Sequence, residues 1–429
     1  MTSEPERAFV WIWLPDATEP VVAGRLDRQG EIVTFAYGDS YLARPEAIPI
    51  YLPDLPLERR AIRPVAGELP GPIADAGPDS WGQRVILNRL VGAQAEDTAE
   101  LGRLTYLLES GSDRIGALDF QASATEYIPR GTGQATLDEL ADAARRVEEG
   151  EPLPPALDEA LLHASSIGGA RPKALLDDGD RRLIAKFSST TDSYPIVKGE
   201  FAAMELARRA GLSVPSVELT SALGRDALLI ERFDRTPAGR RKALVSALTM
   251  LGLDEMTARY GSYADLADMI RARFTEPGPT LRELFARITF NILVGNNDDH
   301  ARNHAAFWAG DMLTLTPAYD ITPTPRSGGE TKQLMAIGRD GFRFSQVQGC
   351  VQRANEYLLS EAQAREIVDR QIEVIDGQWS DVCELARLTG IERRFFWQRQ
   401  FLNPYSLQGF ARASGRVPRA SAGPTIRPG

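Results

Sequence analysis

Residues 290–304 read FNILVGNNDDHARNH and are the most informative stretch of the chain. A nearly all-apolar segment, with the character of a buried helix, ends at Gly295. It is followed at once by a loop crowded with carboxylates, amides and imidazoles. Polar groups gathered at the end of a buried helix are costly unless they are hydrated or bind something. This stretch therefore predicts a functional loop at the end of a core helix.

The spacing inside this loop indicates a particular chemistry. Asp298 and Asn303 stand five positions apart, which is the D-x-x-x-x-N spacing of kinase catalytic loops, where the Asp accepts the hydroxyl proton and the Asn binds magnesium. After a short strand expected at residues 312–315, Asp320 offers a second carboxylate. One carboxylate and one amide, completed by phosphate oxygens and water, make a sufficient magnesium site.

Three features earlier in the chain fit the same chemistry. The Gly168-Gly169 pair could bring backbone N–H groups close to phosphates. Lys186, on the strand that ends a predicted hairpin, could bind the α and β phosphates, and Glu200, expected to open the next helix, could hold that lysine. Each feature is common by itself, but the ordered set is not. The order predicts an ATP- and Mg²⁺-dependent kinase.

Composition sets limits on the class of protein. The 429 residues exceed one ordinary folding unit, and 43% hydrophobic with 25% charged residues is typical of a globular chain. A net charge of −10 argues against a surface that grips nucleic acid over its whole extent. Only Cys350 and Cys383 are present, so neither a disulfide framework nor a thiolate zinc site is expected. Without a secretory signal or an apolar run of membrane length, a cytoplasmic location is expected.

Hydrophobic periodicity and turn residues predict a β-rich amino-terminal module and a mostly helical carboxyl half. Together with the kinase-like order of the polar residues, this leads us to expect an α+β, bilobal, protein-kinase-like fold. The expected divisions are a module at 1–110, a nucleotide-binding lobe at 111–235, a helical catalytic lobe at 236–405 and a flexible basic tail at 406–429. In the first part of the chain, the pattern predicts strands at 9–13, 21–26 and 31–37, with a turn at 27–30. It then predicts helices at 80–107, 137–150 and 200–210, a hairpin at 175–187, and strands at 214–220 and 226–233. Beyond residue 235 it predicts helices, interrupted by loops at 295–338.

Several motifs together resemble the HipA family of bacterial serine/threonine kinases, the toxin halves of HipA/HipB toxin–antitoxin modules. The resemblance runs from about residue 8 to residue 400. The motifs that carry it are PDSWG at 78–82, SIGGARPK at 166–173, ERFDR at 231–235, the stretch from Asp298 to Asn303, and Tyr319-Asp320.

The resemblance implies a role for each matching residue. Asp298 would be the catalytic base, Asn303 and Asp320 would hold magnesium, and Ser166 would be autophosphorylated to switch the kinase off. Phosphate there would add about −1.5 to −2 charges beside two carboxylates, which should displace the loop. The implied nucleotide site comprises Gly168, Gly169, Ala170, Arg171 and Lys173 over the phosphates, Lys186 beside them, the main chain of Glu231, Arg232 and Phe233 at the adenine, and His300, Asn303, Tyr319 and Asp320.

The resemblance also implies partners. One implied partner is a HipB-like DNA-binding antitoxin. The other is a protein substrate, for which the candidate is an aminoacyl-tRNA synthetase, because its modification would halt translation. DNA would be reached only through the antitoxin or the Arg-bearing tail, and no membrane is implied. Two alternatives remain open: a small-molecule kinase built from the same parts, and a non-catalytic corepressor that binds a DNA-binding antitoxin.

Other interpretations of single residues also remain open. His300 and His304 could form a metal pair, but zinc would need another ligand and the one further histidine, His163, is remote in sequence. His300 more simply supports the catalytic loop by hydrogen bonding. Taken alone, Ser166 would be a turn or cap residue, and Lys186 a solvated strand lysine.

Overall fold

The computed structural model describes residues 4–92, 101–131, 135–163, 169, 171–326 and 329–411, without the side chain of His163. Three residues of the predicted site, Ser166, Gly168 and Ala170, lie outside the described residues. So does most of the predicted basic tail.

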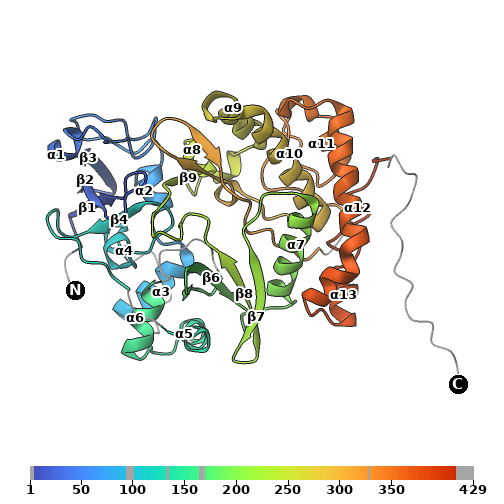
Figure 1. Cartoon of the computed structure of the whole chain (residues 1–429), viewed down its shortest axis with the longest axis horizontal. Coiled ribbons are helices and arrows are strands. Elements are labelled where there is room, and N and C mark those ends of the chain that lie inside the picture. Colours follow the sequence, from blue (N-terminus) through green and yellow to red (C-terminus); the bar gives the residue numbers. More distant parts are fainter. Residues whose placement is uncertain are drawn as a thin grey trace, which may run out of the picture.

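The amino-terminal module is built on an antiparallel sheet of order β3-β2-β1-β4 (Figure 1). Its first three strands confirm the prediction, but the turn is shorter than expected because residues 27–29 continue the pairing with β3 and the chain reverses at Gly30. The strand β4 lies beyond the predicted boundary at residue 110 and pairs with β1. The elements are β1 (Arg7–Ile12), β2 (Val21–Gln29), β3 (Ile32–Tyr37), α1 (Asp39–Leu42), α2 (Gly71–Asp75), α3 (Ser80–Val91), α4 (Arg103–Glu109) and β4 (Leu118–Gln121).

The second sheet, of order β5-β6-β8-β7, confirms the predicted hairpin and the two strands after it. Its strands are β5 (Lys173–Asp178), β6 (Arg181–Phe187), β7 (Val217–Ala222) and β8 (Arg225–Glu231). The two faces of this sheet pack against different helices. Leu228 and Ile230 pack with α7 (Ile196–Ala210), whereas Phe187 and Leu229 pack with α5 (Leu137–Glu149), α6 (Pro155–His163) and Trp81 of α3.

The helix α7 begins four residues earlier than expected, after Pro195. Ile196, Val197 and Gly199 are weak helix formers. Val197 belongs to the main core, and a Cβ on Gly199 would lie 2.7 Å from the ring of Phe396. Close tertiary packing thus extends the helix where local propensity would not. The predicted end is confirmed, since Gly211 caps the helix in the left-handed conformation.

The carboxyl half is mainly helical, as predicted, around the buried helix α10. It also contains a small sheet of order β11-β10-β9, of which only β11 was expected. Strands of three or four residues are too short to show a clear periodicity. The elements are β9 (Leu244–Ser246), α8 (Ala247–Met250), η3 (Ala258–Tyr260), α9 (Tyr263–Arg273), α10 (Pro277–Val294), η4 (Ala301–Asn303), β10 (Ala305–Trp308), β11 (Leu313–Leu315), α11 (Val347–Val351), η5 (Ala354–Tyr357), α12 (Glu361–Leu385) and α13 (Gly390–Phe396).

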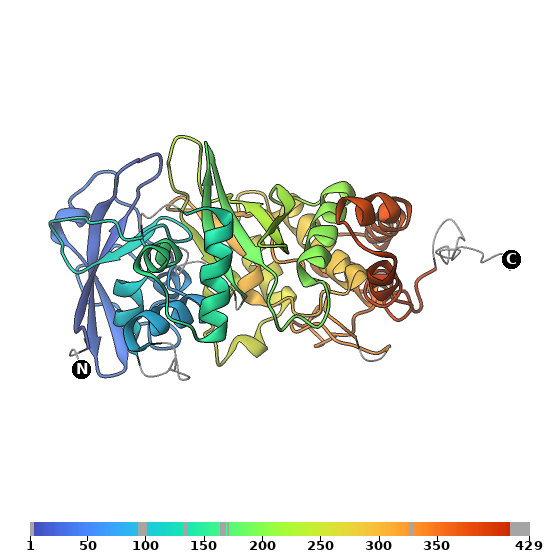
Figure 2. The same cartoon turned by 90° about the horizontal axis from the view of Figure 1, so that it is seen from below.

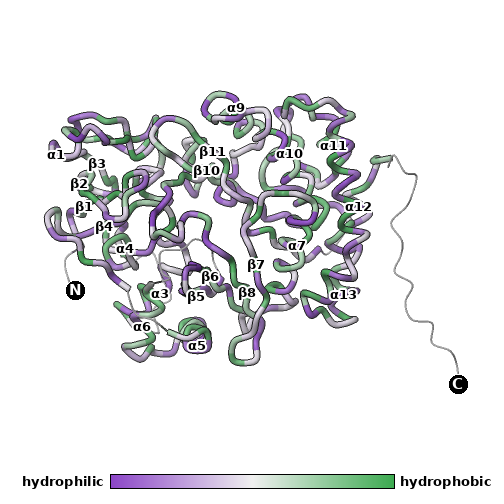
Figure 3. The backbone as a smooth tube through the Cα atoms, viewed as in Figure 1, coloured by the Kyte–Doolittle hydropathy of each residue, from purple (hydrophilic) through white to green (hydrophobic). Residues whose placement is uncertain are grey.

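The amino-terminal β-rich module, the region of the second sheet and the helical carboxyl half lie in a row along the longest axis of the molecule (Figure 2). The β-rich module is at one end, and α12 and α13 are at the other. Hydrophilic and hydrophobic residues are interspersed throughout (Figure 3). Within the described ranges, no helix combines the length and the apolar character that crossing a membrane requires.

A buried group of charged side chains joins the amino-terminal module to residues 231–235, which follow from the end of β8 and which we call the linker. The Arg232 side chain is fully buried and pairs with Asp113 at 2.9 Å and with Asp234 at 2.8 Å. Arg235 pairs with the same two acids at 2.6 and 2.8 Å, and the amide of Gly116 donates to Asp234 at 2.8 Å. Because two arginines share two carboxylates, each acid keeps more than one donor.

Replacing Arg232 is expected to destabilise the fold strongly. Arg232→Met keeps the length of the side chain but removes the two hydrogen bonds that Arg232 donates to the buried Asp234. Breaking such a buried pair costs about 3–5 kcal/mol. Urea unfolding measures this loss. Arg7→Met, which removes an ion pair whose arginine is 54% exposed, is the control and should change the free energy of unfolding by less than about 1 kcal/mol. Equal effects of the two substitutions would contradict the prediction.

A second buried acid should make stability depend on pH in the opposite sense to most carboxylates. Asp54 is 7% exposed, and burial, with the nearby charge of Asp75, raises the pKa of Asp54 to about 6. The folded state therefore binds this proton more tightly than the unfolded state, whose pKa is about 4. The free energy of unfolding consequently falls as pH rises from about 4 through about 6.

Asp54→Asn is therefore expected to stabilise the protein by about 2 kcal/mol at pH 7, by less at pH 5, and hardly at all at pH 4. Urea unfolding at the three pH values measures the difference. Asp39→Asn serves as the control, because the side chain of Asp39 is 85% exposed. A gain that does not depend on pH would show that the Asp54 charge is not its cause.

Candidate active site

Lys186 is the centre of an ion-pair group that joins the two lobes. The alternation of β6 buries Phe187 against α5 and turns Lys186 toward α7. The Lys186 Nζ donates to Glu200 Oε1 and to Asp320 Oδ1, both at 2.6 Å. Burial disfavours the ammonium, but the two carboxylates outweigh it and raise the pKa of Lys186. Glu200, expected to open its helix, instead lies in the second turn of α7 with its side chain 2% exposed.

Lys173 brings a second buried ammonium beside the first. It is the register partner of Lys186 on β5, and its Nζ lies 3.2 Å from Asp79 Oδ2, at the start of α3. Burial lowers the pKa of Lys173, with the Asp79 carboxylate opposing this change and Lys186 adding to it. Gly169 adopts a φ of +116°, and a Cβ there would lie 2.6 Å from the Lys173 Nζ. Glycine thus lets the main chain come close to this ammonium.

The structure gives the two neighbouring acids, Asp298 and Asp299, different surroundings. Asp299 is 2% exposed, and its Oδ2 accepts hydrogen bonds from the hydroxyl of Tyr263 and from Asn291 Nδ2 at 2.7 Å, with His304 Nε2 at 3.1 Å. Burial would raise the pKa of Asp299, but His304 and Tyr263 keep it below its usual value. Asp298 is exposed. Asp299 therefore anchors the loop, and Asp298 is the acid within reach of a substrate.

Although Asp298 is exposed to solvent on one side, the protein around it partly desolvates its carboxylate and raises the pKa of Asp298. The carboxylates of Asp320 and Asp299 add to this effect, and His300 opposes it. A higher pKa makes a carboxylate a better proton acceptor. The local backbone favours this placement, because Gly295 ends α10 in the left-handed conformation and a Cβ there would come within 2.9 Å of the Gln400 main chain.

Asn303 and Asp320 present oxygen atoms suited to a hard cation. The Asn303 Nδ2 lies 3.4 Å from the Asp298 carbonyl, which leaves its Oδ1 as a possible ligand. Asp320 uses Oδ1 for Lys186, whose charge lowers the pKa of Asp320, and Oδ2 remains. The described part of the chain contains no group of three or more His, Cys, Asp or Glu side chains able to hold a metal ion. A magnesium ion here would therefore need phosphate oxygens and water to complete its coordination.

Two of the three main-chain amides at Glu231, Arg232 and Phe233 already have acceptors within the fold. The amides of Glu231 and Arg232 donate to the carbonyls of Ser216 and Arg182 at 2.9 and 2.8 Å. No described residue accepts a hydrogen bond from the amide of Phe233, so this N–H is the linker donor open to a ligand.

Aromatic contacts connect this linker to the catalytic loop. The Phe233 ring lies 5.7 Å from that of Tyr319, whose hydroxyl donates to the carbonyl of Arg302 at 2.6 Å.

Two predicted residues have other partners. The Arg171 guanidinium donates to both carboxylate oxygens of Asp192 at 2.8 and 2.6 Å. His300 accepts the Asn303 amide through its carbonyl at 2.8 Å. The histidines do not act as a pair, because the His304 ring faces Asp299.

Several polar residues around the site were not predicted. They are Asp79, Asp192, Tyr263, Asn291 and Asn296. Asp79 falls in the PDSWG motif, and Asn291 and Asn296 fall in the quoted stretch 290–304, but none of these three was assigned a role. Asp79, Asp192 and Tyr263 contact partners more than 20 residues away, so local sequence gave only a weak signal for them.

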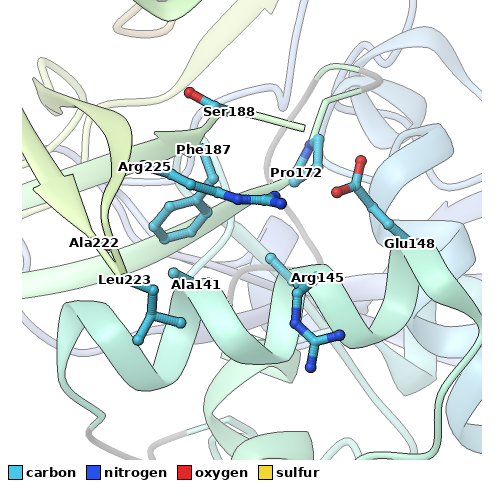
Figure 4. A pocket seen from close by; sticks show the side chains of 10 residues that line it. Ala141, Arg145, Glu148, Pro172, Phe187, Ser188, Ala222, Leu223 and Arg225 are labelled. Carbon is cyan, nitrogen blue, oxygen red and sulfur yellow. The ribbon is translucent and has the colours of Figure 1, made fainter. Parts of the chain in front are cut away.

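A cavity of about 200 Å³ lies on the opposite face of the second sheet, between α5 and the strand ends (Figure 4). Phe187 and Arg225 line it, and Lys186 does not. It is therefore separate from the group around Lys186.

Comparisons with known proteins place this arrangement in a family. The family model "HipA-like C-terminal domain" matches residues 165–379, and the model "HipA N-terminal domain" matches residues 13–121. Y4mE of Sinorhizobium fredii, whose name marks it as a proposed kinase, is 30% identical over 348 residues, covering 73% of this chain and 77% of its own. The "Serine/threonine-protein kinase toxin HipA" of Shewanella oneidensis is 26% identical over 206 residues, covering 41% of this chain and 47% of its own.

A solved structure supports the fold. HipA in a complex of Shewanella oneidensis HipA, HipB and operator DNA superposes with a TM-score of 0.68 at 19% identity, covering 91% of this chain and 95% of that one. The bilobal α+β prediction is confirmed by this likeness. Because both family models match and the Y4mE alignment covers most of each chain, this chain belongs to the HipA-like kinase family.

Proposed function

We propose that this protein is a HipA-like serine/threonine protein kinase that transfers the γ-phosphoryl group of ATP to a hydroxyl of a cellular protein. The observation that carries the proposal is the meeting of Lys186 of β6, Glu200 of α7 and Asp320 of the loop after β11. They lie beside a loop that exposes Asp298 and orients Asn303. Phosphoryl transfer depends on positioning and charge stabilisation, which such a set of polar groups supplies.

In this proposal each residue has a defined task. The Phe233 amide and the linker carbonyls bind the adenine edge, while Lys186 and Lys173 place positive charge at the phosphates. Asp298 orients the attacking hydroxyl and accepts its proton. Asn303 and Asp320 would hold magnesium, which when bound offsets the negative charge of the phosphates.

We extend the proposal to regulation and partners. A HipB-like antitoxin would bind the protein and bring it to DNA, as in the Shewanella complex. Phosphorylation of Ser166 would switch the kinase off. The candidate target is an aminoacyl-tRNA synthetase in the cytoplasm, whose modification would inhibit translation and growth.

The test is incubation of the purified protein with γ-labelled ATP and magnesium, with and without cell lysate, followed by peptide mapping. Label on a serine or threonine of a protein, absent with the Asp298→Asn variant, is the expected result. Label found only on small molecules would instead indicate a small-molecule kinase. No transfer to any acceptor would overturn the proposal and favour the corepressor alternative.

A further inference from the structure

The segment Asp75-Ala76-Gly77-Pro78-Asp79 connects α2 to α3 of the amino-terminal module and has a carboxylate at each end. We call these five residues the brace. Its two carboxylates contact different lobes of the kinase core, which neither the family assignment nor the proposed function explains.

Asp75 contacts the catalytic side. Its carboxylate accepts the amide of Ser246 at 2.8 Å and the hydroxyl of Ser246 at 2.6 Å. Ser246 is the register partner of Ala305, two residues after Asn303. The Arg302 guanidinium, inside the catalytic loop, lies 4.0 Å from Asp75. The Asp75 side chain is 8% exposed, so these donors replace water around a buried charge.

Asp79 contacts the nucleotide side. It caps α3 by accepting the amide of Gly82 at 2.9 Å, and its Oδ2 lies 3.2 Å from the Lys173 Nζ. The Trp81 Nε1 donates to the carbonyl of Lys173 at 3.1 Å. The first turn of α3 therefore holds Lys173 by both its side chain and its main chain.

The brace is short and restricted. Four peptide units span at most about 14 Å, and Pro78 fixes one backbone angle. The Asp79 carboxylate also offsets the repulsion between the ammonium groups of Lys173 and Lys186, which stand opposite each other on neighbouring strands. A short connection thus ends on the lysine pair at one side and on the catalytic loop at the other.

We propose that Asp75 and Asp79 are positioning residues, and that the brace sets the spacing between the lysine pair of the nucleotide lobe and the catalytic loop of the helical lobe. Its effect on phosphoryl transfer rests on the proposed function, but its effect on the spacing does not. The amino-terminal module is on this account a working part of the active site.

The spacing is measured with pairs of spin labels on the full chain. Labels at Asp180→Cys, in the exposed β5–β6 turn, and at Met256→Cys, 83% exposed, report on the two lobes. The native Cys350 and Cys383 are buried. Asp79→Ser keeps a capping oxygen for α3 but loses the ion pair, and Asp75→Asn keeps an acceptor for Ser246 but loses the charge. We expect each variant to broaden or shift the distance distribution.

Asp16→Asn is the matched control. It removes the exposed pair between Asp16 of the module and Arg240, which also connects the module to the chain beyond the linker, and should leave the distribution unchanged. Unfolding midpoints of all variants identify any general loss of fold. A distribution in the doubly substituted protein that equals the wild type would overturn the proposal.

Steady-state kinetics give the second readout. Each single substitution should lower kcat about tenfold, and Asp79→Ser should also raise the KM for ATP through Lys173. The double variant should lose little more than the worse single one, because releasing either end releases the brace. Losses that multiply, together with an unchanged distance distribution, would show two independent local roles. If the wild type transfers no phosphate, the proposed function fails, while the label distances still decide on the brace.

Discussion

Asp298→Asn is expected to lower kcat by about 10³-fold, within the range by which a positioned acid or base accelerates a reaction. Asparagine has nearly the same shape but cannot accept the proton of the attacking hydroxyl. Since Asp298 is exposed, the free energy of unfolding should change by less than about 0.5 kcal/mol. The KM for ATP should remain within a few fold of wild type. Single-turnover phosphorylation and equilibrium nucleotide binding measure the two effects separately.

Asp299→Asn supplies the matched comparison one residue away. Asp299 accepts the Tyr263 hydroxyl and the Asn291 amide in the core, so its substitution should lower the free energy of unfolding by about 2 kcal/mol or more. Its loss of activity should follow the loss of folded protein. If Asp298→Asn retained activity while Asp299→Asn lost it at full stability, the base assignment would move to Asp299.

Asp320→Asn is expected to lower kcat/KM by at least about 10²-fold, because the variant loses the charge that would bind a cation and the partner of Lys186. The substitution suits the backbone. Asp320 has a φ of +59°, and asparagine is among the few residues that tolerate the left-handed region. A defect would therefore not come from backbone strain. Activity measured against magnesium concentration should show a raised requirement.

Asp311→Asn is the control for this experiment. Asp311 is exposed in the turn before β11, and among the described residues its side chain bonds only the adjacent Met312 amide. It should keep full activity. If the magnesium dependence of Asp320→Asn equalled that of the wild type, Asp320 would not be a metal ligand. This would hold even if the overall rate fell because Lys186 had lost its partner.

The parts of the site that follow from local chain order were predictable. Short stretches of sequence were enough to predict the hairpin that carries Lys186, the spacing from Asp298 to Asn303 and the Gly295 cap. The structure brings Lys186, Glu200 and Asp320 together. Their roles in catalysis stay predictions.

Features that depend on long-range contacts could not be predicted. In the sequence, only the spacing to Asn303 selects Asp298 over Asp299. The different burial of the two acids was not predictable, because it depends on Tyr263, 36 residues away, and on the way Asn291 and His304 close around Asp299 in the folded chain. The prediction that Glu200 opens its helix was wrong for a similar reason, because tertiary packing, and not local helix propensity, determines where α7 begins.

The late strand β4 has a practical consequence for anyone who shortens this protein. It covers one side of β1, although more than one hundred residues separate the two strands in sequence. A fragment that stopped at residue 110 would leave the main-chain donors and acceptors of β1 unsatisfied along an open border, a surface that recruits strands from other molecules. Such a fragment should self-associate, whereas one that runs through residue 121 keeps the border closed.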